Sequence, residues 1–368
     1  MMYQHSGGQK NLVATLLIGM CVLVGTSAWA EEGFDLQQFS PMPDQSRNFL
    51  SASSAMVSPH LEWQGFLLLN HGNAPLVVRN RDGERASVVG SHSMMNLMGS
   101  VGLYDIVELG LDFPLFIQQS SGDVSIEGLD LEGAGFGLGD MRLVPKVQVF
   151  STREVEAQEG MALAVISDLY LPLGDGSRLQ GGEFRGGIRL AYDVVINNGT
   201  RFAVNAGYLM RPTREVAGLE VGDALTWAVA GEIPITAVPV PSDLRVVGEL
   251  AGKVGVGVEE ITVAQMPVEL LVGARYQYDN LFAQLGGGVG LASGYGTPRM
   301  RAIFSMGFVA STWHSSGAGL EMPASQVSAP SSVAEEENSQ ETQQEEPVDQ
   351  EHTEEKQYDG SDEERVED

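Results

Sequence analysis

Between Leu61 and Trp313, apolar and polar residues alternate with a period of two, and clusters of Gly, Pro, Asn and Asp interrupt the alternation. In the stretch 106–116, every second residue from Val107 to Leu115 is apolar, and the residues between them are Glu108, Gly110, Asp112 and Pro114. Because successive side chains of a β-strand point to opposite faces, this alternation predicts strands with one apolar and one polar face.

Twelve such segments follow one another, approximately at 61–71, 86–101, 104–117, 137–150, 160–172, 184–196, 200–211, 221–235, 243–256, 266–278, 280–292 and 298–310. Most are longer than the usual ~5–6 residues of strands in soluble sheets, and they suit membrane strands of about 9–11 residues. We therefore predict an all-β fold, an antiparallel transmembrane β-barrel of about twelve strands, within residues 59–313.

The links between these segments alternate in length. Short links are expected at Gly102–Asp105, Asn197–Thr200 and Tyr278–Asn280, and long ones at Gly72–Arg85, Gln118–Phe136, Leu173–Glu183 and Pro212–Glu220. The alternation is imperfect at 151–159, 236–242 and 293–297. In bacterial barrels short turns are periplasmic, long loops are extracellular and the strand number is even. This pattern predicts a barrel in the outer membrane with both termini in the periplasm.

A soluble β-sandwich or a water-soluble barrel is the competing interpretation. In both of these folds the apolar face points inward and the polar face meets water. Periodicity alone does not distinguish the two arrangements. The length of the segments, their even number and the frequency of Gly, at 45 residues, favour the membrane barrel.

The first thirty residues have the pattern of a secretory signal peptide. A polar stretch ends at Lys10, an apolar run extends from Leu12 to Gly25, and Ala28-Trp29-Ala30 follows. The apolar run is short for a membrane-spanning helix, and small-x-small residues precede signal cleavage sites. We expect residues 1–30 to be removed, with an uncleaved anchor as the alternative. The only cysteine of the chain, Cys21, lies within this segment.

Two further segments lack the alternation. Residues 31–58 contain Pro41, Pro43 and several serines, and they are either a periplasmic lead-in or a plug within the lumen. Residues 314–368 are rich in Glu, Gln, Ser and Asp, a composition that cannot bury enough apolar surface to fold. We predict a disordered acidic tail. It is either a solvated end of the chain or a binding site for a cationic periplasmic partner.

The formal net charge is −28, with 17 acidic and 2 basic residues from Glu321 onward, or −15 for that stretch. No basic face is available to neutralise phosphates, so binding of nucleic acid is not expected.

The polar faces of the predicted strands carry charged residues of both signs, namely Glu108, Asp112, Arg142, Lys146, Asp168, Arg189, Asp193, Arg201, Glu232, Arg245, Glu249, Lys253, Glu269, Arg275 and Arg301. They are candidate lumen-lining residues. One interpretation is a charged pore lining that sets solute selectivity. The other is a set of cross-strand ion pairs that fills and rigidifies the lumen.

Catalytic and cofactor chemistry finds little support. His92 stands between Ser91 and Ser93, but in a strand it points away from both neighbours. The sequence shows no Cys/His spacing for a metal. The glycine run 286–290 lacks the Lys-Ser/Thr and the helix of a phosphate loop. We expect no enzymatic activity, no cofactor and no metal.

Several stretches resemble the N-terminal barrels of OmpA-family and transporter-like Gram-negative outer-membrane proteins. They are Gly102–Gly110, Gly137–Lys146, Leu171–Gly176, Asn205–Tyr208 and Gly294–Arg299. The resemblance covers roughly residues 45–313, and its motifs are structural. It implies a barrel in the outer membrane. Members of that group often continue into a peptidoglycan-binding domain, whereas this chain ends in the acidic tail.

Together these features predict a porin-like protein, a passive channel or transporter-like pore for small solutes. The alternative is a structural or interaction protein with a filled, non-conducting lumen. The expected partners are outer-membrane lipid and, during biogenesis, the barrel assembly machinery. The solute and the oligomeric state are not readable from the sequence.

Overall fold

The computed structural model describes residues 34–79, 85–124, 136–153, 159–196, 198–216, 218–236, 243–257, 261–292 and 294–311. The predicted signal peptide, the acidic tail and the tips of several loops lie outside these ranges. Within them, no helix has the length and apolar character required to cross a bilayer.

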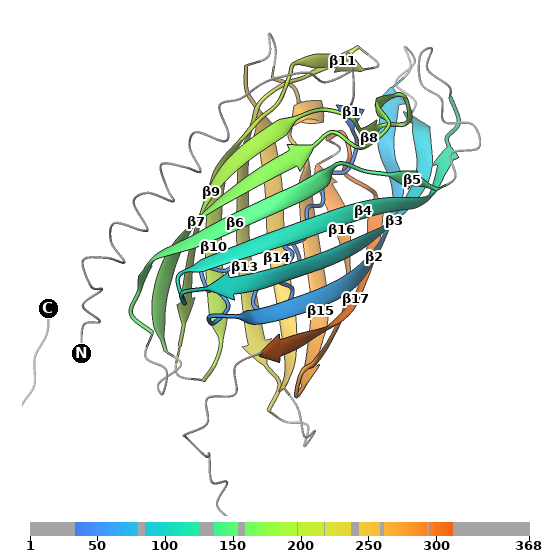
Figure 1. The fold of residues 1–368 in the computed structure, drawn as a ribbon. Coiled ribbons are helices and arrows are strands. Elements are labelled where there is room, and N and C mark those ends of the chain that lie inside the picture. Colours follow the sequence, from blue (N-terminus) through green and yellow to red (C-terminus); the bar gives the residue numbers. More distant parts are fainter. Residues whose placement is uncertain are drawn as a thin grey trace, which may run out of the picture. The chain divides into compact units, whose positions relative to one another are not determined.

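Twelve antiparallel strands form a closed barrel (Figure 1). The strands are β2 (Glu62–Arg79), β3 (Arg85–Leu103), β4 (Val107–Ser121), β6 (Met141–Ser151), β7 (Gly160–Leu171), β9 (Arg185–Val195), β10 (Arg201–Met210), β13 (Ala224–Pro234), β14 (Asp243–Gly255), β15 (Val268–Tyr278), β16 (Leu281–Ala292) and β17 (Met300–Ser311). Pairing of β17 with β2 closes the barrel. Closure leaves no unpaired edge, as a sheet within a membrane requires.

Several short elements lie at one end of this barrel. They are β5 (Gly137–Leu138), β8 (Gln180–Gly181), β11 (Arg214–Val216), β12 (Leu219–Val221) and the 3-10 turns Gly176–Arg178 and Val263–Gln265. We call the end of the barrel at which β2, β4, β7, β10, β14 and β16 finish the loop end. The opposite end, at which β3, β6, β9, β13, β15 and β17 finish, is the turn end.

The apolar faces of the strands point outward. Leu109, Leu190, Val229 and Leu285 are 40%, 51%, 50% and 66% exposed, whereas the residues between such positions are mostly buried. A water-soluble barrel would have the opposite arrangement, so the exposed apolar surface favours contact with lipid.

Strand β2 differs most from the predicted segments. It continues to Arg79, although a long link was expected from Gly72. The register with β3 shifts between Asn73 and Leu76, and Ala74 has a φ of 48°. The extra residue of such a bulge interrupts the two-residue alternation. The predicted strand therefore ended too early. The other eleven segments overlap the observed strands, with ends that differ by at most four residues.

Residues 34–61, the luminal segment, pass through the inside of the barrel (Figure 1). The segment begins at the loop end, where β1 (Phe34–Asp35) pairs with β8. It ends at the turn end, where β2 begins and where Ser311 of β17 pairs with Glu62. Phe34 and Ser311 therefore lie at opposite ends of the barrel, which differs from the expectation that lead-in and tail share one side.

Candidate functional site

All fifteen charged residues predicted to line the lumen lie on the inner face of the barrel, and most are buried. The strand period explains this placement, because each of them alternates with an outward apolar residue. All except Glu249 and Lys253 form an ion pair within the described part of the chain. The interpretation as cross-strand pairs therefore describes most of the set.

One group of pairs lies on β4, β6, β7 and β9. Arg142 contacts Asp112 at 3.2 Å and Asp168 at 3.4 Å, and Arg189 binds Asp168 with two nitrogens at 2.9 Å each. Asp168 therefore accepts from two guanidinium groups. A bidentate arginine–carboxylate contact is geometrically specific, so it fixes both side chains.

A second group surrounds Glu232 on β13. Its carboxylate receives Arg275 at 2.7 Å, Arg245 at 3.2 Å and Arg201 at 3.3 Å. Asp243 also binds Arg245 at 2.6 Å, so two carboxylates and three guanidinium groups meet here. Two of these arginines, Arg201 and Arg275, also donate to backbone carbonyls of the luminal segment.

Binding of the luminal segment is the role that the sequence did not reveal. Glu249, which has no cationic partner among the described residues, accepts the backbone N–H groups of Leu50, Ser51 and Ala52 at 3.1, 2.9 and 2.9 Å. Lys146 donates to the Met56 carbonyl at 2.8 Å and also pairs with Glu108 at 3.1 Å. The wall therefore supplies hydrogen-bond partners to a backbone that forms no sheet there.

Uncharged wall residues have the same role and were not predicted. Asn205 accepts the N–H of Ser53 at 2.7 Å and donates to its carbonyl at 2.8 Å, and Gln148 donates to the Ala55 carbonyl at 3.0 Å. Their inward position could be read from the alternation. Their partners could not, because residues 31–58 show no periodicity.

A further carboxylate that accepts backbone N–H groups, that of Asp140, lies in the connection before β6. One of its oxygens accepts the N–H groups of Leu173, Gly174 and Gly182 at 3.2, 3.0 and 2.7 Å, and the other receives Arg185 at 3.1 Å. Burial raises the pKa of the Asp140 carboxyl, and the charge of Arg185 opposes this rise. Asp140 thereby holds the loop that carries β8, the pairing partner of β1.

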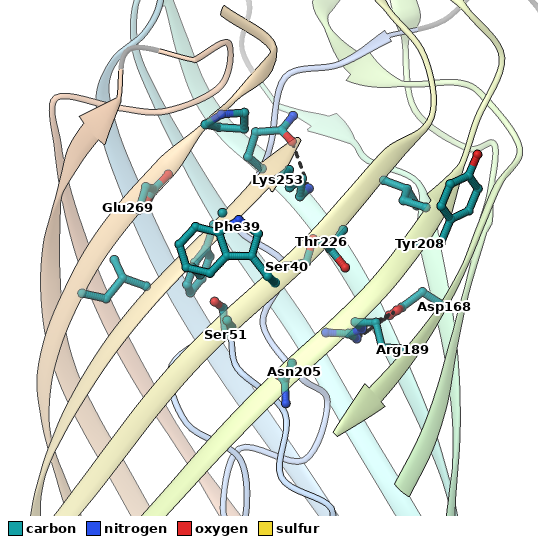
Figure 2. A pocket seen from close by; sticks show the side chains of 18 of the residues that line it. Phe39, Ser40, Ser51, Asp168, Arg189, Asn205, Tyr208, Thr226, Lys253 and Glu269 are labelled. Atoms are coloured by element: carbon teal, nitrogen blue, oxygen red, sulfur yellow. Dashed lines mark hydrogen bonds and ion pairs between the residues drawn. The ribbon is translucent and has the colours of Figure 1, made fainter. Parts of the chain in front are cut away.

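The luminal segment does not fill the barrel completely. A cavity of about 110 Å³ lies beside it, between Gln38, Phe39, Ser40 and Ser51 of the segment and the strands from β6 to β15 (Figure 2). Asp168, Arg189, Asn205, Lys253 and Glu269 contribute the polar part of its wall. Such a cavity is large enough for several waters or one small solute.

The histidine and its serine neighbours do not form a catalytic group with one another. His92 is buried on the inner face, and Ser91 bonds to Ser120 on the other side of the sheet. Ser93 contacts His71 of β2 at 2.9 Å. The described residues contain no group of three His, Cys, Asp or Glu side chains that could hold a metal.

No family model matches the chain, and no curated protein matches it. Solved structures do match. The COG4313 outer membrane channel from Pseudomonas putida F1 is 17% identical, with 70% of this chain and 98% of that chain covered and a TM-score of 0.49. LpxR from Salmonella typhimurium is 8% identical, with 66% and 99% covered and a TM-score of 0.36. OprD from Pseudomonas aeruginosa is 7% identical, with 71% and 99% covered and a TM-score of 0.31.

Nothing in these comparisons points to the OmpA family, so that resemblance stays an expectation.

Proposed function

We propose that this protein is an outer-membrane barrel that forms a narrow, channel-like pore for small solutes, with the luminal segment restricting passage. The observation that carries the proposal is a polar lumen that is only partly filled. The cavity beside the segment is polar on one side and extends along strands from β6 to β15. A purely structural core would be packed without such a space.

The outer surface supports the location. Apolar side chains cover the outward faces of the strands, and the lipid side of an outer-membrane barrel has this character.

The second candidate is a barrel with a sealed lumen. The specific observation in its favour is the dense binding of residues 44–58, where Glu249, Asn205, Lys146 and Arg275 all contact the backbone. In that case the segment would act as a permanent core, and the connections at the loop end would carry the function.

Planar-bilayer recordings of the protein purified from outer membranes test both candidates. We expect discrete steps of low conductance from the natural chain and larger steps from a variant without residues 34–58. Val229→Ala, a change on the lipid face, is the matched control and should conduct like the natural chain.

Steps from the deletion variant alone would mean that the natural lumen is sealed, which would support the second candidate. Silence from both proteins would refute the pore. If the deletion variant does not fold, Glu249→Leu loosens the segment without shortening the chain and takes its place.

A further inference from the structure

The cavity beside the luminal segment owes its existence to small inward residues. On β13 and β14, Thr226, Ala228 and Ala251 occupy positions where larger side chains would fill the space. Gly207 on β10 makes room for Arg189, because a Cβ atom at position 207 would lie 2.4 Å from Cγ of Arg189. The hollow is therefore a consequence of side-chain size along one part of the wall.

Both carboxylates of the cavity wall are already neutralised. Asp168 is bound by Arg189 through two contacts of 2.9 Å, and Figure 2 shows this pair at the edge of the hollow. Glu269 is bound by Arg301 through two contacts of 2.8 Å. Neither carboxylate is free to attract a cation.

Lys253 is the unmatched charge of the same wall. Its Nζ donates to Oε1 of Gln38 at 2.9 Å, and no carboxylate pairs with it among the residues that the structure describes. The nearby guanidinium groups of Arg185 and Arg189 are each paired with carboxylates, those of Asp35 and Asp168, whereas the ammonium group of Lys253 has only the neutral Gln38. An ammonium group has three donors, so Lys253 has capacity for a further acceptor.

Other parts of the lining are apolar. Ala228, Ala251 and Leu271 come from the wall, and Phe39, which Figure 2 labels, comes from the luminal segment. An apolar cavity of about 150 Å³ holds one benzene molecule, so 110 Å³ suits a ligand of at most about six heavy atoms.

From this combination we infer that the cavity binds small aliphatic monocarboxylates, with the carboxylate on Lys253 and the short chain against Ala228 and Ala251. As a statement about the solute that the pore admits, the inference rests on the proposed function. As a statement about binding, it is measured independently of conductance.

Isothermal titration of the refolded protein with butyrate, and with butyramide as the neutral analogue of the same size, tests the inference. Butyrate should bind, and butyramide should bind at least tenfold more weakly, since a hydrogen bond to a charged group is worth about 1.5–3 kcal/mol. Lys253→Gln should reduce the affinity for butyrate about tenfold and leave that for butyramide nearly unchanged.

Ala251→Leu keeps every charge and fills the hollow, so it should abolish binding of both compounds. Ala274→Leu makes the same increase in size on the exposed outer face of β15 and should change neither affinity. Heat-modifiable migration on a gel verifies that each variant is folded.

Equal affinities for butyrate and butyramide, or full butyrate affinity in Lys253→Gln, would overturn the inference. Binding of butyrate by a protein that shows no conductance would refute the pore and leave the binding site intact. Conductance without butyrate binding would refute the binding site and leave the pore intact.

Discussion

The two parts of the luminal segment are held in different ways. Residues 44–58 are bound directly by the barrel wall, where Glu249, Asn205 and Lys146 satisfy successive backbone groups. Residues 34–37 are bound by the loop end, through Leu179, Arg185 and β8, and residues 38–43, beside the cavity, also contact the wall through Lys253 and Arg142. The first part, residues 34–43, therefore depends on the loops as well as the sheet, and the second part, residues 44–58, depends on the sheet.

This difference indicates which part of the luminal segment opens at the lower free energy. Local opening has a low free energy where few buried contacts are broken and a high one where many are broken. The first part of the segment can loosen with the loops while the second part stays bound. The luminal segment would then open only in part, beside the cavity, and the rest of it would still narrow the pore.

The largest effect is expected at Glu249. Replacement by Leu leaves the N–H groups of Leu50, Ser51 and Ala52 buried without an acceptor, and each orphan costs about 1–3 kcal/mol. The free energy of unfolding in urea should fall by about 3 kcal/mol. Glu249→Gln keeps an acceptor oxygen and should cost about 1 kcal/mol. Equal loss in both variants would contradict direct binding of the second part.

A smaller effect is expected where the two parts meet. A Cβ atom at Gly110 of β4 would lie 2.8 Å from Cγ of Pro43, so Gly110→Ala should cost about 1–3 kcal/mol by overpacking. Pro43→Gly in the same chain should restore most of this loss in urea unfolding. Additive losses in the double variant would show that the segment does not rest on β4 at this point.

The contact of Gly110 with Pro43 also affects how well the inner face of β4 tolerates a charged side chain compared with the outer face. Leu109→Arg places a charge on the lipid side at a cost of about 2–4 kcal/mol near mid-bilayer. Polarity alone would make position 110 tolerant of Arg. Since Pro43 occupies that space, we expect Gly110→Arg to impair folding too, measured as the fraction of heat-modifiable protein.

The first part of the segment should respond to Asp35→Asn by about 1 kcal/mol, because Asn keeps an acceptor oxygen for Arg185 and Arg185 keeps its contact with Asp140. Hydrogen exchange should accelerate at the Leu36 amide, which donates to Leu179, and stay unchanged at Leu50–Ala52. Acceleration at both places would mean that the segment moves as one unit.

The smallest effect concerns pH and Asp140. Because its pKa is raised in the folded chain, the folded state holds the proton more tightly than the unfolded state. The stability contributed by this carboxyl is largest below the unfolded pKa and declines as pH rises through the folded pKa. The unfolding midpoint of the natural chain, relative to Asp140→Asn, should therefore be higher near pH 4 than near pH 7. A difference that grows with pH would contradict a raised pKa.

The strands and the facing of their charges could be predicted because both follow from a local period of two. Glu108 and Asp112 are buried, whereas their neighbours Leu109 and Phe113 are exposed, as the alternation predicts. The bulge in β2 could not be predicted, because one inserted residue looks like the end of a strand in the sequence.

The partners of the luminal charges could not be predicted either. Glu249 binds backbone N–H groups, which every residue except proline possesses, so the sequence of the luminal segment carries no signature of the contact. The cavity was equally hidden. It depends on which wall strands carry Ala and Thr at the same height, and this requires the register between β13 and β14.

Closure of the barrel by β17 and β2 has a consequence for the order of assembly. The luminal segment directly precedes β2, the first strand of the seam, and β17 is the last barrel strand in the chain. While the seam is open, the segment can enter the interior sideways. Once the seam has formed, only end-on threading past the wall contacts remains. The luminal segment must therefore enter the interior before β17 pairs with β2. The refolding rate should depend on which of these two events comes first.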